Sequence, residues 1–383
     1  MRAPRRLFAL VPTVALVLAL GACSSDDVEP RRAPDESTLT APTSRPDDEA
    51  SATPSPPDET GGRPRFAGTV ATGLEVPWGI AFLPDGTALI AERDSALIKA
   101  LGRSGDLRTA GEVPGVVPSS EGGLLGLAVS PSFDQDQMIY AYFSTAEDNR
   151  VVRMEYDGRS LGEPEPILTG IPVGSIHNGG RLLFGPDEML YVSTGETGDA
   201  DLAQDPDSLG GKILRTAPDG SVPSDNPDPD SPVWTSGHRN VQGLAFDDRD
   251  RLWATEFGSD VWDELNLIEA GNNYGWPAAE GDSDLKGFVD PRVQWQPENA
   301  SPSGLAFADG HLWAASLRGE RLWRIPVRSD GSVGPPEALL LGDYGRLRTA
   351  VRAPDGSVWV STSNHDGRGT PGPQDDRILE LRP

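Results

Sequence analysis

The chain of 383 residues is poor in several residue types that build common functional sites. It has one cysteine, four histidines and three lysines. The single cysteine, Cys23, excludes an internal disulfide. Acidic residues outnumber basic ones, 59 to 33, and the formal net charge is −26. This charge argues against binding nucleic acid or anionic lipid through bulk electrostatics, and it favours metal cations or a basic redox partner.

The first 22 residues have the layout of a signal peptide. A start with three arginines precedes an apolar run over residues 7–20, which is too short for a comfortable membrane span. The run closes on Leu20-Gly21-Ala22-Cys23, which resembles a bacterial lipobox and implies lipidation of Cys23. The alternative is a plain secretory signal with an incidental cysteine. We therefore expect an exported protein, held by its lipid at the outer face of the bacterial cytoplasmic membrane.

Residues 23–63 are predicted to be a disordered, lipid-anchored linker. They consist mainly of Pro, Ser, Thr, Asp, Glu and Arg, and Val28 and Leu39 are the only large apolar residues after the cysteine. Such a segment cannot bury enough surface to offset the entropy of ordering. Residues 64–383 remain, which is enough for one large domain.

A short phrase recurs six times in that domain and predicts its architecture. Each copy is a hydrophobic strand, a turn rich in Pro, Asp or Gly, and a second strand. The copies begin at residues 82, 129, 184, 246, 307 and 352, in steps of 45 to 62 residues. Hairpins that recur every 40–50 residues or so are typical of four-stranded propeller blades. We therefore predict an all-β, six-bladed β-propeller with antiparallel blades, against the alternative of a β-sandwich with similar turns.

Two glycine-rich segments before the third and fourth repeats carry candidate catalytic residues, because propeller sites lie on loops near the central channel. His177 stands in the segment 176–182, and histidine can take a proton near neutral pH. The alternative is a histidine that satisfies a local carbonyl. Arg239 and Asn240 stand together in the segment 237–244 and suit a planar anion with several oxygens. The alternative there is an arginine that ties two blades together.

Two further groups of residues point to charged ligands. The segments 256–266 and 271–277 combine carboxylates with turn carbonyls, which Ca²⁺ prefers, although their spacing is not that of an EF-hand. Arg318, Arg346 and Arg348 come late in the chain, and alternation puts the last two on one side of an extended strand. Several arginines around one channel imply a ligand with several negative charges. The alternative is surface salt bridges, which contribute little.

The chain resembles the soluble quinoprotein glucose and aldose-sugar dehydrogenases, the glucose/sorbosone dehydrogenase family, from about residue 69 to 381. Several motifs in the same order carry this resemblance: Pro77-Trp78-Gly79-Ile80-Ala81-Phe82, Gly123-Leu124-Leu125-Gly126, Gly179-Gly180-Arg181-Leu182, Gly211-Lys212-Ile213-Leu214-Arg215, residues 237–246, Asp263-Glu264-Leu265-Asn266-Leu267-Ile268 and Asn273-Tyr274-Gly275-Trp276-Pro277. The resemblance implies a six-bladed propeller that binds pyrroloquinoline quinone (PQQ) and Ca²⁺ and oxidises the C1 hydroxyl of aldose sugars to lactones.

The resemblance also implies roles for individual residues. His177 matches the general base, and Arg239, which we place in the catalytic set, matches with Asn240 the residues that contact the cofactor near its reactive carbonyls. Glu121 stands at a cofactor position where relatives often carry Gln. Ile176 replaces the Asp of the best-known glucose oxidisers.

The remaining matches concern the cofactor carboxylates and the metal ions. Arg318, Arg346 and Arg348 match basic positions that hold the carboxylates, with Arg in place of the usual Lys at 318. The carbonyls of Gly258 and Ser259, the latter replacing a Pro, match ligands of the cofactor-bound Ca²⁺. The side chain of Glu264 and the carbonyl of Tyr274 match a second, structural Ca²⁺ site.

Two other function classes remain open at this point. One is a calcium-dependent six-bladed lactonase that uses metal-bound water and no quinone, and the other is a non-catalytic ligand-binding propeller. For the dehydrogenase, the expected partners are an aldose substrate, a membrane quinone or cytochrome as electron acceptor, and the membrane through the lipid anchor. No nucleic acid is expected.

Overall fold

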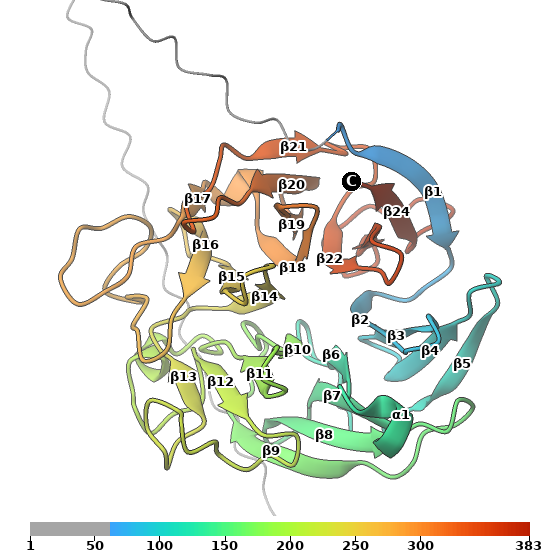
Figure 1. The fold of residues 1–383 in the computed structure, drawn as a ribbon, viewed down its shortest axis with the longest axis horizontal. Coiled ribbons are helices and arrows are strands. Elements are labelled where there is room, and N and C mark those ends of the chain that lie inside the picture. The colour runs from blue at the N-terminus through green and yellow to red at the C-terminus, as the bar shows by residue number, and fades with distance from the viewer. Residues whose placement is uncertain (1–61) are drawn as a thin grey trace, which may run out of the picture. The chain divides into compact units, whose positions relative to one another are not determined.

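Six antiparallel sheets of four strands each stand around a central channel in residues 62–383, the part of the chain that this computed structural model describes (Figure 1). The predicted six-bladed β-propeller is therefore confirmed. Residues 1–61, with the predicted signal peptide, Cys23 and nearly all of the linker, lie outside the described residues, and those predictions stay predictions. Within residues 62–383, no helix has the length and apolar character needed to cross a membrane.

The blades follow one another along the chain, and each begins with its innermost strand. The first contains β2 (Pro77–Phe82), β3 (Ala88–Glu92), β4 (Leu97–Leu101) and β5 (Leu107–Glu112). The second contains β6 (Leu124–Val129), β7 (Met138–Ser144), β8 (Asn149–Glu155) and β9 (Glu165–Ile171), with α1 (Phe133–Asp136) after β6. The third contains β10 (Leu182–Phe184), β11 (Leu190–Ser193), β12 (Ile213–Thr216) and β13 (Val233–Thr235), with the 3₁₀ helix η1 (Ala200–Ala203) after β11.

The other three blades have the same order. The fourth contains β14 (Val241–Phe246), β15 (Leu252–Glu256), β16 (Asp263–Ile268) and β17 (Val293–Trp295), followed by the 3₁₀ helix η2 (Pro297–Asn299). The fifth contains β18 (Pro302–Ala308), β19 (His311–Ser316), β20 (Arg321–Pro326) and β21 (Glu337–Leu339). The sixth contains β22 (Leu347–Arg352), β23 (Val358–Thr362), β24 (Ile378–Arg382) and, on its outer edge, β1 (Arg65–Ala71).

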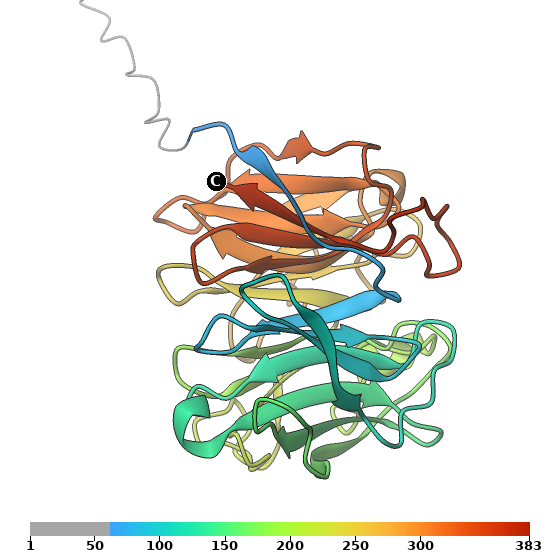
Figure 2. The same cartoon turned by 90° about the vertical axis from the view of Figure 1, so that its right-hand side faces the viewer.

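The sixth blade is completed by a strand from the other end of the domain. β1 pairs antiparallel with β24, from Arg65 opposite Arg382 to Ala71 opposite Ile378 (Figure 2). A strand pair alone is only marginally stable, so each blade depends on its neighbours for burial of its faces. The pairing of β1 with β24 therefore closes the ring.

Close contact between inner strands explains a glycine in the middle of several of them. A Cβ on Gly126 of β6 would lie 2.2 Å from the carbonyl oxygen of Gly180, and one on Gly243 of β14 would lie 2.3 Å from that of Ser303. Such distances are far inside normal contact, so only glycine allows the neighbouring backbones to approach in this way. Behind the inner strands, wholly buried aromatic residues such as Trp313 fill the space between adjacent blades.

Strand direction decides which end of the channel carries the site. The six repeated turns join the first and second strands of each blade, so they all lie at one end. The loops that lead into the inner strands, and those that join second to third strands, lie at the opposite end, because successive strands alternate in direction. All the predicted loop segments that carry His177, Arg239, Gly258, Arg318 and Arg346 belong to that opposite end.

Candidate active site

His177 and a buried glutamate form the centre of the site. His177 lies in the loop before β10 and has a left-handed backbone with φ of 53°, which is uncommon for a residue other than glycine. Its Nδ1 lies 2.6 Å from Oε1 of Glu196, whose side chain is 3% exposed. Because a carboxylate accepts this bond, Nδ1 carries the hydrogen, and the lone pair of Nε2 is left to take a proton.

Glu121 also contacts the histidine, through the backbone. Its Oε2 accepts the N–H of His177 at 3.0 Å, and its Oε1 lies 2.7 Å from Nη1 of Arg368, which comes from the loop between β23 and β24. Burial alone would raise the pKa of Glu121, but the N–H group and the guanidinium hold the pKa below its usual value. Glu121, which stands where relatives often carry Gln, thus has a cationic partner in Arg368. The sequence alone did not reveal this partner.

Arg239 and Asn240 present buried donors that have no partner within the described residues. Arg239 Nη1 donates to the carbonyls of Phe257 and Gly258, while its Nε has no acceptor at hydrogen-bond distance and lies 4.0 Å from Glu196 Oε1. Asn240 is fully buried, and its Oδ1 accepts the N–H of Gly179 at 3.1 Å. Its Nδ2 has no partner within residues 62–383. A buried unpaired donor is costly, so these two groups imply an acceptor supplied by a ligand.

Arg346 and Arg348 converge on a single carboxylate. Their Nη2 atoms lie 2.9 and 3.3 Å from Oδ2 of Asp366, and all three side chains are nine-tenths buried or more. The two arginines lie on the same side, as alternation along the chain predicts. Burial lowers the pKa of Arg348 to about 10, so the group is still charged at neutral pH. Two guanidinium groups on one carboxylate leave a surplus positive charge for an anionic ligand.

A further buried arginine extends this positive charge along the channel. Arg181 Nε donates to the backbone carbonyl of Gln242 at 2.9 Å, and its guanidinium lies 4.2 Å from the ring centroid of Trp78. The Gln242 side chain in turn accepts Nη1 of Arg348 at 3.1 Å. Burial and the charge of Arg348 lower the pKa of Arg181 to about 9. Arg181 has no carboxylate partner within residues 62–383, so its charge adds to that of Arg348.

Arg318 is not tied to the other site residues. It lies on the turn between β19 and β20, at the same end of the channel, but its side chain is exposed. Within the described part of the chain it makes no ion pair or hydrogen bond. The geometry therefore supports three of the four predicted arginines, Arg239, Arg346 and Arg348, as a connected set.

Three of the four predicted metal ligands line one small cavity, and the fourth, Ser259, lies beside it. The carbonyl of Gly258 accepts Arg239 Nη1, and Ser259 is exposed beside it. Gly258, Glu264 and Tyr274 line a cavity of about 10 Å³, whose other charged side chains are those of Arg239, Glu256 and Glu280. Burial and the charge of Glu256 raise the pKa of Glu264 to about 8. Buried carboxylates around a space the size of one water molecule form an oxygen donor set that suits Ca²⁺.

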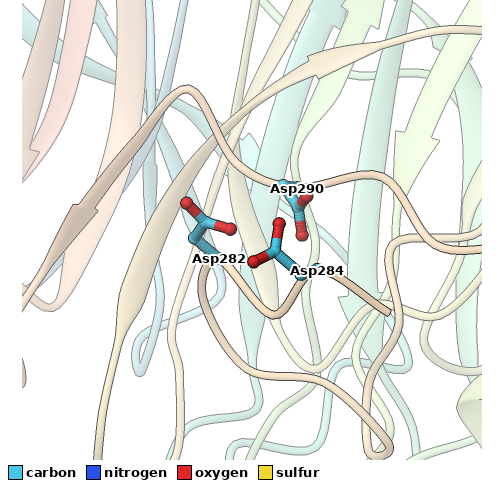
Figure 3. Close-up of side chains that lie close together, drawn as sticks. All are labelled: Asp282, Asp284 and Asp290. Carbon is cyan, nitrogen blue, oxygen red and sulfur yellow. The ribbon is translucent and has the colours of Figure 1, made fainter. Parts of the chain in front are cut away.

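The structure also brings three aspartates together outside this site. Asp282, Asp284 and Asp290 have carboxylate oxygens within 4.8 Å of one another, and all three side chains are exposed (Figure 3). The three lie on the connection between β16 and β17. Exposed acidic groups in a chain of this charge need no ion, and we assign none.

The donor set fits a flat cofactor with several carboxylates. Buried arginines supply fixed positive charge, the unpaired Arg239 Nε and Asn240 Nδ2 supply hydrogen-bond donors, and the Glu196–His177 pair supplies a base. Sequence reasoning missed Glu196, Arg181, Asp366 and Arg368. Glu196 could have been found, since it stands between Gly195 and Gly198 directly after a strand, as His177 stands before one. A six-bladed propeller whose channel holds these groups has the architecture of a quinoprotein dehydrogenase.

Comparison with known proteins agrees with this class. The family model described as Glucose / Sorbosone dehydrogenase matches residues 74–370. The solved structure of the PQQ-bound aldose sugar dehydrogenase of Streptomyces coelicolor is 56% identical with a TM-score of 0.82, covering 84% of this chain and 98% of that one. An aldose sugar dehydrogenase of Escherichia coli is 29% identical over 77% of this chain and 89% of its own. Quinoprotein glucose dehydrogenase B of Acinetobacter calcoaceticus is 32% identical over 57% of this chain and 54% of its own.

The chain belongs to the glucose/sorbosone dehydrogenase family. The resemblance read from the sequence motifs is confirmed. Because the family model spans most of residues 62–383, the family assignment applies to the whole propeller and not to one blade.

Proposed function

We propose that the protein is a PQQ-dependent aldose sugar dehydrogenase that oxidises the C1 hydroxyl of aldoses to lactones with the help of Ca²⁺. The observation that carries the proposal is the convergence of buried Arg348 and Arg181 with the unpaired donors of Arg239 and Asn240 beside His177. An anion with several oxygens is the ligand that such a set recognises. The 56% identity to an aldose sugar dehydrogenase solved with PQQ supports the same assignment.

The chain's own residues would hold the cofactor and the metal in a fixed arrangement. Arg346 and Arg348 would hold carboxylates, Asn240 and Arg239 would donate to carbonyl oxygens, and the Gly258 carbonyl would ligate Ca²⁺. When bound, PQQ accepts the hydride, and Ca²⁺ polarises the quinone as a Lewis acid. The arginines are buried and already bonded, so their orientation is set before binding.

The Glu196–His177 pair performs the proton step. Glu196 holds Nδ1, so Nε2 of His177 takes the proton from the oxygen of the sugar C1 hydroxyl as hydride leaves C1 itself. The carboxylate stabilises the imidazolium that forms, and such a positioned base contributes about 10²- to 10⁴-fold in rate. The paired state of Glu121 limits its repulsion of an anionic cofactor.

The other function classes gain no specific support from the geometry. A lactonase that activates water on a metal has no use for Arg181 and Arg348, whose burial is costly. A purely binding propeller has no use for a histidine whose tautomer is fixed by a buried carboxylate.

The location of the protein belongs to this proposal as well. The signal-peptide layout and Leu20-Gly21-Ala22-Cys23 support export and attachment through a lipid on Cys23. A tethered dehydrogenase would pass its electrons to a membrane quinone or a cytochrome.

The test is reconstitution of the purified protein. PQQ and Ca²⁺ are added together and separately, and dye reduction is followed with several aldoses. We expect activity only with both additions, and His177→Ala should lose at least 100-fold in turnover while it still binds PQQ. Parent-level turnover by this variant would refute the role of His177, and lactone hydrolysis without PQQ would favour the lactonase.

A further inference from the structure

Glu280 organises the loop that carries the expected ligands of the cofactor-bound Ca²⁺. Its Oε1 atom accepts three backbone N–H groups, from Ser259 at 2.7 Å and from Val261 and Trp262 at 3.0 Å each. These residues lie between β15 and β16, where no sheet partner satisfies the backbone. A single carboxylate oxygen thus replaces the hydrogen bonds that a regular strand would make.

The bond to Ser259 sets the direction of the neighbouring carbonyl. The N–H of Ser259 and the C=O of Gly258 belong to one peptide unit, and in a trans peptide these two groups point in opposite directions. When Glu280 binds that N–H, the Gly258 carbonyl is turned away from Glu280. It is the same carbonyl that accepts Arg239 Nη1 in the site. Glu280 therefore fixes the orientation of an expected metal ligand without lying next to it in sequence.

The loop has little freedom to reach this orientation by another route. A Cβ on Gly258 would lie 1.8 Å from the carbonyl oxygen of Trp262 and 2.6 Å from Glu280 Oε1. The N–H of Gly258 is itself bound by Asp263 Oδ1 at 2.9 Å. The loop is therefore closed around the Glu280 carboxylate, and its two ends are fixed.

Glu280 also belongs to the cavity that Glu264 and Tyr274 line. The next residue, Gly281, donates its N–H to Glu264 Oε1 at 2.6 Å. Any cation that Glu264 and Tyr274 hold would therefore also fix the backbone at residues 280–281. Gly258 lines the same cavity, so the segment joins the Glu264 side of the cavity to its Gly258 side.

We propose that Glu280 is a positioning residue that couples the two calcium sites. Ca²⁺ held by Glu264 would fix residues 280–281, and the Glu280 carboxylate, through the N–H of Ser259, would then keep the Gly258 carbonyl in the orientation that the structure shows. The inference rests on the proposed function. Its consequence is that Ca²⁺ held by Glu264 and Tyr274 would raise the affinity for PQQ with Ca²⁺.

The test compares Glu280→Ala, Glu280→Gln and the control Glu298→Ala, which removes an exposed glutamate from η2 after the same blade. PQQ affinity is measured by fluorescence titration over a series of Ca²⁺ concentrations, and Ca²⁺ binding to the PQQ-free protein is measured by calorimetry. We expect Glu280→Ala to weaken PQQ binding at least tenfold at saturating Ca²⁺. Glu280→Gln keeps an oxygen acceptor and should recover most of the affinity. The control should match the parent.

The outcomes separate this inference from the proposed function. If the parent does not bind PQQ, the proposed function fails and the coupling fails with it. If the parent binds PQQ, and Glu280→Ala binds it equally well with the same Ca²⁺ dependence, the coupling is refuted while the function stands. Equal losses of PQQ affinity in Glu280→Ala and Glu280→Gln would also refute it. PQQ binding would then depend on the negative charge of Glu280 and not on its role as acceptor for the N–H groups. Should Glu280→Ala fail to fold, the comparison of Glu280→Gln with the parent decides: a loss of tenfold or more refutes the inference, and near-parent affinity with the parent's Ca²⁺ dependence supports it.

Discussion

Glu264 should make the stability of the metal-free protein fall as the pH rises, and Ca²⁺ should reverse this. Burial and the charge of Glu256 raise the pKa of Glu264 from its ordinary 4.5 to about 8. Between these values the folded state keeps a proton that the unfolded chain has released. The stabilising contribution is therefore complete below pH 4.5 and is lost as the pH rises through 8.

The size of the effect follows from the difference between the two pKa values. One pKa unit corresponds to about 1.4 kcal/mol, which gives an upper bound of roughly 5 kcal/mol for the loss. Asp263, whose pKa burial raises to about 6, acts in the same direction. Ca²⁺ takes the place of the protons on the cavity carboxylates, so its stabilisation should grow over the same pH range.

The assay is equilibrium urea unfolding at pH 5 and pH 8, with EDTA and with Ca²⁺. In EDTA we expect a lower free energy of unfolding at pH 8, by several kcal/mol, and little difference when Ca²⁺ is present. Glu264→Gln should remove most of the pH dependence, and Glu298→Gln, at an exposed position, should keep it. Equal stability of the metal-free parent at both pH values would refute the reasoning, as would an unchanged slope in Glu264→Gln.

Three other changes test the site and the packing of the third blade. Glu196→Gln removes the charge that stabilises imidazolium at His177, so we expect turnover to fall about 10- to 100-fold, with little change in PQQ affinity, in steady-state assays of the reconstituted enzyme. Arg368→Ala leaves Glu121 without its ion-pair partner, so the Kd for PQQ should rise several-fold in a titration, and Glu121→Gln in the same chain should restore it; no restoration would show that the carboxylate is not responsible. Lys212 is buried and donates to three backbone carbonyls, so Lys212→Met should lower the free energy of unfolding by about 2–4 kcal/mol. A loss under about 1 kcal/mol would contradict the assigned contacts.

Much of the fold could be predicted because the repeat depends on short-range sequence patterns. Each hairpin copy, such as the one from Phe82, needs only local turn chemistry and two apolar runs, and the ring follows because no blade is stable alone. The closure of the ring by β1 was not predicted. That pairing joins residues 65–71 to residues 378–382, and no local sequence pattern predicts a contact over so long a separation.

The site could be predicted in part for the same reason. His177, Arg239 and Asn240 stand in glycine-rich segments at strand entrances, where local sequence marks a loop near the channel. Glu196, Asp366 and Arg368 act through partners that lie far away in the sequence, so only the folded chain shows which of the many acidic residues are paired. Arg318 looked equivalent to Arg346 in sequence, but exposure separates them.

The pairing of β1 with β24 has a consequence for the order of assembly. Synthesis delivers β1 before any other strand of the propeller and β24 after all the others, so the outermost pair of the sixth blade can form only when the whole domain has left the ribosome. Until β24 pairs with them, β1 and β23 each expose an unpaired edge that can pair with another chain. A chain that lacked β24 would therefore be prone to aggregate, even though it would contain every catalytic group.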